Sequence, residues 1–193
     1  MMATVDATSN DDHSKSLSWD GWNSNIKYFG LELQIPYAQY LLDGTKSIET
    51  RGYRLPHALL SKRIDVLESR KGVDGVSSIP DRVLLMPRTS VDDDALPSTA
   101  TTMLHRKGWC TFTHCFRYTT REQFEADAHK HLVDAASGYG WNDARPMYGW
   151  VVGSYGLYDN NDDKEKKEDD GVEYIAERRM RSLFEITENR RSE

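Results

Sequence analysis

Hydrophobic and aromatic residues along the chain gather in short runs separated by turn-forming residues. Runs of four to twelve residues rich in β-branched and aromatic side chains are typical of strands. Two runs instead have the spacing of helices, one over 37–42, between Pro36 and Gly44, and one over 120–136, after a possible capping box of Thr119 with Glu122. Strands are predicted at 28–34, 47–52, 63–69, 108–118, 147–158, 172–175 and 181–186, with one short element near 83–86.

These elements do not alternate as strand and helix, so the pattern does not favour a parallel α/β sheet. Several strands with two helices indicate an α+β fold that is mainly β, in which a β-barrel carries a few attached helices. Within the strand over 108–118, Cys110 and Cys115 are an odd number of positions apart, so regular alternation places them on opposite faces. We therefore expect two ordinary buried thiols and no disulfide.

Polarity along the chain predicts one folded domain between two tails. Residues 1–25 are rich in Ser, Asp and Asn and are expected to form a disordered tail, followed by a domain over 26–186 and a short tail over 187–193. Within the domain, 70–107 is expected to be a loop-rich insertion and 159–171 a charged loop.

Charge is distributed unevenly. The net charge is −6, but residues 26–158 carry 16 basic and 15 acidic side chains, so the acidity belongs to the two ends. The acidic balance therefore does not exclude nucleic-acid binding by the central part. No stretch approaches the roughly 18 apolar residues of a membrane span, and residues 1–18 contain no apolar run, so no signal peptide is expected. We expect an intracellular protein of the cytoplasm or nucleus, with no membrane association.

The segment from Gln34 to Arg51 concentrates the chemistry. A Gly turn at Gly44 precedes a strand dense in charge, on which Glu49 and Arg51 share one face and Lys46 lies on the other. A guanidinium offers a planar fork of donors for phosphate or carboxylate, and a lysine close to a Gly turn can reach a phosphate.

This segment resembles the ASCH family of the PUA-like superfamily. The family pattern is Q-P-[YW]-A, a short helix and then G-x-K-x-x-E-x-R. Here Gln34 and Pro36 are separated by one residue, Tyr37 and Ala38 follow, and the second part runs from Gly44 to Arg51. The resemblance is closest to the eukaryotic branch that includes the endothelium-overexpressed lipopolysaccharide-associated factor and the C-terminal domain of activating signal cointegrator 1. It implies a PUA-like barrel with a cleft lined by the motif.

The resemblance implies RNA or a modified nucleotide as the ligand. Its expected ligand-binding residues are Tyr37, Gly44, Lys46, Glu49 and Arg51, where Tyr37 either stacks on a base or belongs to the core. The resemblance also leaves two alternatives. Some bacterial members are amidohydrolases of acetylcytidine whose Lys matches Lys46 and whose Thr falls on Glu49, so a hydrolase on an acylated base or a ribonuclease would use Lys46 and Glu49 as catalytic residues. The other alternative is a protein-interaction module.

Other candidate residues have simpler interpretations. Trp109 and Trp150 are expected to fill the barrel rather than line the cleft. His129 and His131 are two apart on a helix and share no face, so no metal ligand set is expected and no cofactor is predicted. The cluster from Arg178 to Arg181 is either a basic edge or a contact for a phosphate backbone.

Overall fold

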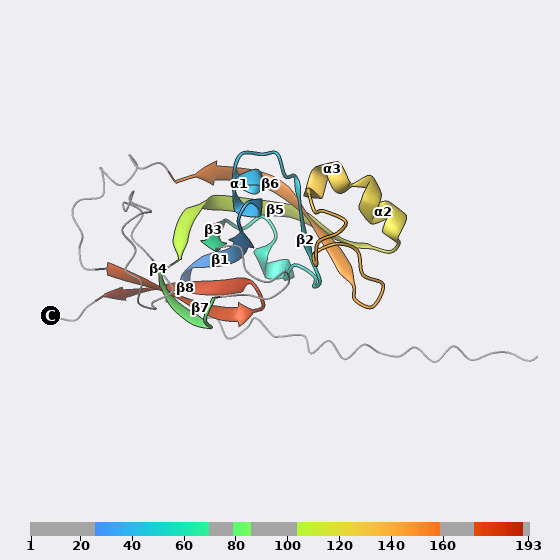
Figure 1. Cartoon of the computed structure of the whole chain (residues 1–193). Helices are drawn as coiled ribbons and strands as arrows, with labels where there is room; N and C mark the ends of the chain where they lie inside the picture. Colours follow the sequence, from blue (N-terminus) through green and yellow to red (C-terminus); the bar gives the residue numbers. More distant parts are fainter. Residues whose placement is uncertain (1–25, 70–78, 86–103, 159–171, 191–193) are drawn as a thin grey trace, which may run out of the picture.

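The structure is a computed structural model that describes residues 26–69, 79–85, 104–158 and 172–190 (Figure 1). Expectations about the segments 1–25, 70–78, 86–103, 159–171 and 191–193 lie outside the described residues. The described chain is mainly β with a few short helices, as the sequence predicts. The strands are β1 (Ile26–Gln34), β2 (Ile48–Arg51), β3 (Ile64–Ser69), β4 (Arg82–Leu85), β5 (His105–Tyr118), β6 (Met147–Leu157), β7 (Val172–Met180) and β8 (Leu183–Arg190). The helices are α1 (Tyr37–Leu42), the 3-10 turn η2 (His57–Leu59), α2 (Arg121–Ala126) and α3 (Ala128–His131).

The strands form one mixed sheet in the order β2-β6-β5-β3-β1-β8-β7-β4. Strands β1 and β3 run parallel, and the other named pairs are antiparallel. The sheet curls, so that β6 and the β7–β8 hairpin lie on opposite sides of β1 and β3 (Figure 1). Its edge strands β2 and β4 do not pair in the described residues, so the predicted barrel is an open one.

Apolar side chains from both halves of the curled sheet pack into its interior. Trp150 is fully buried, with its ring 5.3 Å from that of Phe112 and 5.4 Å from that of Tyr53. Burial of a large aromatic side chain is among the largest single contributions to a core. Trp150 thus fills the fold as predicted. Trp109 does not, because it is only half-buried and packs under the Arg63 guanidinium at 4.7 Å.

The helix predicted over 120–136 is broken into α2 and α3 at Asp127, and Leu132 ends it in the left-handed region with φ 56°. The N-cap also differs from the prediction. Thr120, not Thr119, caps α2 by accepting a hydrogen bond from the Gln123 amide at 3.3 Å. The break lets His131 turn inward, where it is fully buried, whereas His129 stays exposed.

Three further local expectations are revised. Strand β8 continues to Arg190, so the folded part extends beyond residue 186. The insertion over 70–107 contains β4 at the place where a short element is predicted, but its last residues already belong to β5, which begins at His105. Register shifts in β5 on either side of Phe112 change the alternation, so Cys110 and Cys115 contact the same core cluster instead of opposite faces. Both cysteines are free. None of the described helices is long and apolar enough to cross a membrane.

Candidate functional site

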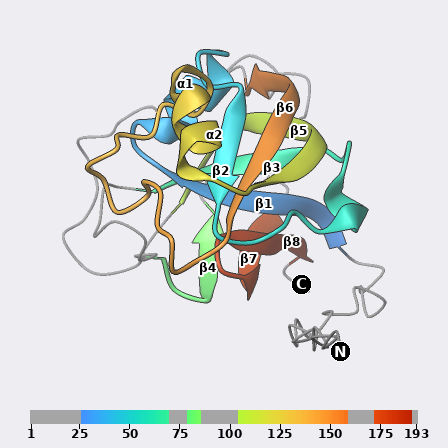
Figure 2. The same cartoon turned by 90° about the vertical axis from the view of Figure 1, so that its right-hand side faces the viewer.

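A cavity of about 540 Å³ opens where the curled sheet fails to close. The end of β1 and the edge strand β2 line one part of it, and the β7–β8 hairpin lines another. The loop between α3 and β6 supplies a third wall and runs from the helices toward the β7–β8 side of the fold (Figure 2), and Tyr37 of α1 and residues 79 and 81 before β4 also line the cavity. Cavities of a few hundred cubic ångströms hold nucleotide-sized ligands.

Lys46 reaches this cavity because of the turn before β2. Gly44 adopts φ +82°, which favours glycine, and the Asp43 carboxylate accepts a hydrogen bond from the Thr45 amide at 2.9 Å. Strand β2 therefore begins only at Ile48, and Lys46 lies outside the strand alternation. The prediction that Lys46 faces away from Glu49 is wrong: its Nζ lies 3.5 Å from Glu49 Oε2.

The Lys46 ammonium is almost completely buried, with 1% of the side chain exposed. Its Nζ donates a hydrogen bond to the backbone carbonyl of His131. Burial lowers the pKa of Lys46, and the nearby Arg51 charge lowers it further, whereas Glu49 opposes both effects. A lysine held in this way retains donors for a ligand in the cavity.

Glu49 and Arg51 lie on the same side of β2, as the alternation predicts. Arg51 Nε is 2.9 Å from Glu49 Oε1, and Arg51 Nη2 donates a hydrogen bond to the Glu32 carbonyl at 2.8 Å. Burial acts against the Arg51 charge, but the Glu49 carboxylate outweighs it and the pKa of Arg51 is raised. The Glu49–Arg51 pair does not fill the cavity, which both side chains line.

Hydrogen bonding on the cavity floor is incomplete. Glu49 Oε2 and Arg51 Nε are buried and have no hydrogen-bond partner among the described residues. For Arg51 the reason is that its Nε–H does not point along the 2.9 Å contact to Glu49 Oε1. Buried polar groups without partners are rare in folded proteins. Such groups are typical of a site that a ligand or water completes.

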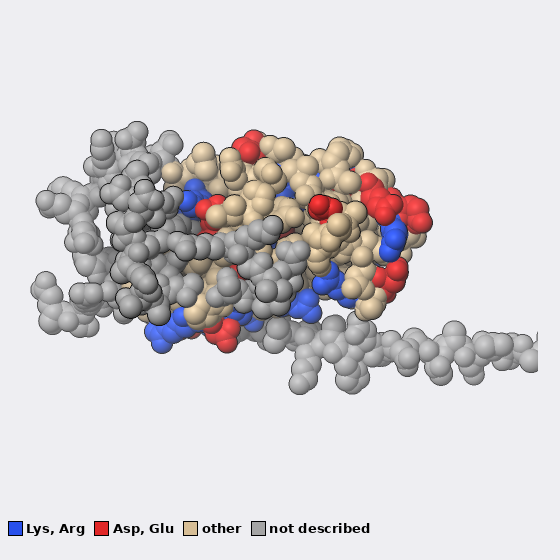
Figure 3. All heavy atoms as spheres, viewed as in Figure 1, with Lys and Arg blue, Asp and Glu red and all other residues tan. Residues whose placement is uncertain are grey.

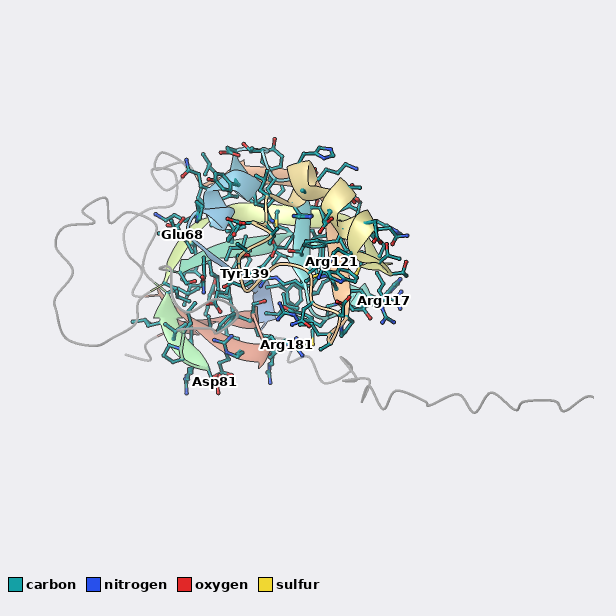
Figure 4. All side chains as sticks on the ribbon, turned by 45° about the vertical axis from the view of Figure 1, so that its right-hand side comes forward. Glu68, Asp81, Arg117, Arg121, Tyr139 and Arg181 are labelled. Carbon is teal, nitrogen blue, oxygen red and sulfur yellow. The ribbon has the colours of Figure 1, made fainter. Side chains whose placement is uncertain are left out.

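Two tyrosines form an aromatic wall above the floor. Tyr37 is half-buried and meets the ring of Tyr139 edge-on, with the centroids 6.0 Å apart and the planes at 80°. Lys46 Nζ lies 5.3 Å from the centre of the Tyr37 ring. Tyr139 is not among the site residues expected from the sequence, although an aromatic residue between Gly138 and Gly140 in a long loop is a signal that could have indicated it. Figure 4 labels Tyr139 in front of the sheet.

Three arginines from outside β2 border the cavity, and they differ in their ion pairs and in their exposure to solvent. Arg178 is engaged by Asp81 at 3.0 Å and by Glu32 at 3.5 Å. Arg145 and Arg181 are exposed. Arg145 donates to the Gly138 carbonyl at 2.6 Å, and the Arg181 guanidinium lies 5.4 Å from the centre of the Tyr53 ring.

Of the cluster from Arg178 to Arg181, Arg179 pairs with Glu185 and does not line the cavity. The basic side chains visible on this face gather along its lower side, and acidic side chains gather at the end that carries α2 and α3 (Figure 3). Arg145 and Arg181 thus place two exposed positive charges at the rim, where Asp81 is also exposed and pairs with Arg178.

The motif residues do not all belong to the cavity. Tyr37, Lys46, Glu49 and Arg51 line it, but Gly44 does not. Gly44 instead lies directly beneath the phenol of Tyr155, with no room for a side chain. Its role is to shape the turn. In the described part of the chain, no group of three His, Cys, Asp or Glu side chains is placed to hold a metal ion.

The curled sheet with its short helices and its cleft forms a mainly β domain. No family model and no curated protein sequence matches the chain. Among solved structures it is similar to ASCH from Zymomonas mobilis, at 12% identity over 68% of this chain and 70% of that chain, with a TM-score of 0.41. Two mutants of that protein give TM-scores of 0.43 and 0.44 at 12% and 14% identity, each over 86% of this chain and 91% of that chain. These structures bear the name of the family that the segment from Gln34 to Arg51 resembles.

Proposed function

We propose that the cavity binds one nucleotide unit of an RNA chain or a modified nucleotide. The observation that carries the proposal is a nucleotide-sized cavity in which a charged floor of Lys46, Glu49 and Arg51 lies beside an aromatic wall. Unstacked bases are recognised in proteins by hydrogen bonds to their edges and by contacts with aromatic rings. The floor supplies the first kind of contact and the tyrosines Tyr37 and Tyr139 supply the second.

The rim fits the phosphates of such a ligand. Arg145 and Arg181 are exposed at the cavity, on the loop before β6 and on the β7–β8 turn respectively. Arginine pairs with phosphate through two parallel hydrogen bonds, and such contacts dominate the affinity of nucleic-acid binding. A base on the floor and a backbone across the rim would use the three floor groups and the two exposed arginines, while Arg178 remains paired with Glu32 and Asp81.

The first test is thermal melting with a panel of nucleotides, acetylcytidine and short single-stranded RNA and DNA. A ligand that binds only the folded state raises the melting temperature by mass action. We expect short RNA to raise it and Arg51→Ala to abolish the shift, because that substitution removes the floor guanidinium. If no ligand in the panel shifts a well-folded sample, the proposal is wrong and a protein-interaction module becomes the better interpretation.

Two matched double variants distinguish phosphate contacts made by the rim arginines from non-specific attraction by positive charge. Arg145→Ala with Arg181→Ala removes two exposed cavity arginines, whereas Arg117→Ala with Arg121→Ala removes two exposed arginines that do not line the cavity. Figure 4 labels Arg117, Arg121 and Arg181. We expect the first pair to weaken RNA binding at least tenfold and the second to change it little, because the loss of an exposed phosphate contact acts locally. Equal losses would indicate non-specific attraction.

A second candidate function is hydrolysis of an acylated nucleobase. The favouring observation is the buried Lys46 amine, with its lowered pKa, 3.5 Å from the Glu49 carboxylate. Glu49 would take a proton from a water that attacks the acyl carbon, Lys46 would donate a hydrogen bond to the oxyanion that forms on the acyl oxygen, and Glu49 would pass the proton to the exocyclic nitrogen as the C–N bond breaks and acetate leaves. The test is release of acetate from acetylcytidine, which Lys46→Ala should abolish. Binding of acetylcytidine without turnover would leave only the binding function.

A further inference from the structure

The three charged groups on the cavity floor follow a fixed order. Glu49 lies between the two cations, with Oε2 3.5 Å from Lys46 Nζ and Oε1 2.9 Å from Arg51 Nε. A carboxylate only accepts hydrogen bonds, whereas ammonium and guanidinium groups only donate them. The floor is therefore a row of donor, acceptor and donor.

The outer members of this row are held in place by the backbone. Lys46 is fixed by the His131 carbonyl and Arg51 by the Glu32 carbonyl. Lys46 uses one of its three N–H groups on His131, and Arg51 Nε and Glu49 Oε2 have no hydrogen-bond partner among the described residues. The row thus keeps unused capacity in a fixed arrangement, which reduces the entropy lost when a ligand binds.

The edges of the RNA bases differ in how they match such a row. Uracil presents a carbonyl, an N–H and a second carbonyl, which is the complement of donor, acceptor and donor. Cytosine and adenine both place an acceptor nitrogen opposite the Glu49 carboxylate, where two acceptors repel. Guanine offers an N–H there, but its amino group then faces a cation. Mismatched buried polar groups are the main source of discrimination between otherwise similar ligands.

We propose that the floor row of Lys46, Glu49 and Arg51 selects a base with an imide edge, so that the preferred ligand is a uracil-type base in single-stranded RNA. This inference rests on the proposed nucleotide-binding function. The uracil N–H donates to Glu49, and the two carbonyls accept from Lys46 and Arg51. Tyr37 and Tyr139 flank the bound base, and the rim arginines hold its phosphates.

The test compares fluorescence anisotropy of three labelled RNA hexamers at one salt concentration: oligouridine, oligocytidine and oligo-3-methyluridine. The third ligand keeps both carbonyls but has a methyl group in place of the imide N–H. We expect oligouridine to bind at least about tenfold more tightly than either of the others, the discrimination typical of a well-matched base edge. Equal binding of the three, or tighter binding of oligocytidine, overturns the inference and leaves the proposed function standing. No binding of any hexamer overturns both.

A substitution in the row gives a second, independent measurement. Glu49→Gln replaces the carboxylate by an uncharged amide that accepts the uracil N–H more weakly, and its N–H₂ can donate to the acceptor nitrogen of cytosine, whose amino group still faces a cation. We expect oligouridine to bind at least tenfold more weakly and oligocytidine to change little, so that the preference for oligouridine is lost. A structural role of Glu49 would weaken both hexamers alike, and that result would contradict the assignment.

The matched control for Glu49→Gln is Glu68→Gln. Glu68 is on β3, pairs with Lys107 at 3.4 Å and does not line the cavity, and Figure 4 labels it far from Arg181. The control makes the same change of charge, so it should leave the preference for oligouridine unchanged. If Glu49→Gln fails to fold in a melting experiment, the comparison of uridine with 3-methyluridine on the unmodified protein still decides the inference.

Discussion

Lys46 Nζ donates a hydrogen bond to the backbone carbonyl of His131, 85 residues further along the chain. This contact joins the turn before β2 to the end of α3. It buries a lysine on the floor of the cavity and gives a partner to a carbonyl that the end of a short helix leaves free. The same hydrogen bond therefore positions a cavity residue and connects two parts of the fold.

Replacing Lys46 by Met is expected to destabilise the protein. Met has a similar length but no donor, so the His131 carbonyl loses its partner and Glu49 keeps only Arg51. A buried acceptor without a partner costs about 1–3 kcal/mol in free energy of unfolding. Urea denaturation measures the loss, and Lys62→Met at an exposed position should change the stability by less than about 0.5 kcal/mol. An unchanged midpoint for Lys46→Met would show that the bond contributes nothing.

His131 predicts a dependence of stability on pH. Its Nδ1 accepts from the Val133 amide at 3.0 Å, so the ring proton is on Nε2, which donates to the Phe124 carbonyl at 2.9 Å. Burial lowers the pKa of His131 below its ordinary value of 6.5, and the Lys46 charge lowers it further, whereas the bond to Phe124 and the Asp127 and Glu49 charges oppose this. The unfolded chain therefore binds a proton more readily than the folded one near and below pH 6.5.

The free energy of unfolding should accordingly fall as the pH drops from 6.5, the ordinary pKa of histidine, through the lowered pKa of His131 in the folded protein. Urea denaturation between about pH 5 and 8 measures this slope. His131→Gln cannot titrate and should show a smaller fall over the same interval, although it is less stable at neutral pH. A fall of the same size in both proteins would assign the dependence to other groups.

Gly44→Ala is expected to lower stability without altering the cavity. Gly44 has φ +82°, and a side chain there meets the Tyr155 phenol. Strain of this kind costs about 1–3 kcal/mol. We expect a lower urea midpoint and, at temperatures where the variant is folded, the affinity of the unmodified protein for short RNA. A large loss of affinity in the folded variant would contradict this structural role and indicate that Gly44 belongs to the binding site.

The rim arginines predict the salt dependence of binding. Each phosphate contact contributes roughly 0.7 to the slope of log affinity against log salt for single strands. Arg145→Ala with Arg181→Ala should therefore lower the slope by about 1–1.5, measured by anisotropy over a series of salt concentrations. Arg117→Ala with Arg121→Ala should leave the slope nearly unchanged, and the reverse result would place the phosphates elsewhere.

Local sequence determines the part of the site that is continuous in the chain. Strand, short helix, glycine turn and charged strand follow from the residues between β1 and β2, and strand alternation places Glu49 beside Arg51. Alternation fails for Lys46, because the turn at Gly44 delays the start of β2. The sequence pattern likewise does not predict the break in the helix at Asp127, because the apolar spacing continues through it. The burial of His131 depends on tertiary packing.

Tertiary structure alone decides the rest of the site. Tyr139, Arg145 and Arg181 are about 90 to 140 residues from the motif and line the cavity because the curled sheet brings the loop before β6 and the β7–β8 turn to the edge of β2. Pairing of β1 with both β3 and β8 joins the two halves of the sheet, and no local pattern encodes which strands become neighbours. The sequence by itself thus determined the charged motif and the mainly β fold, because these depend on residues close in the chain. The fold decided the burial of Lys46, the order of the floor groups and the position of the rim arginines, because these depend on contacts between segments far apart in the sequence.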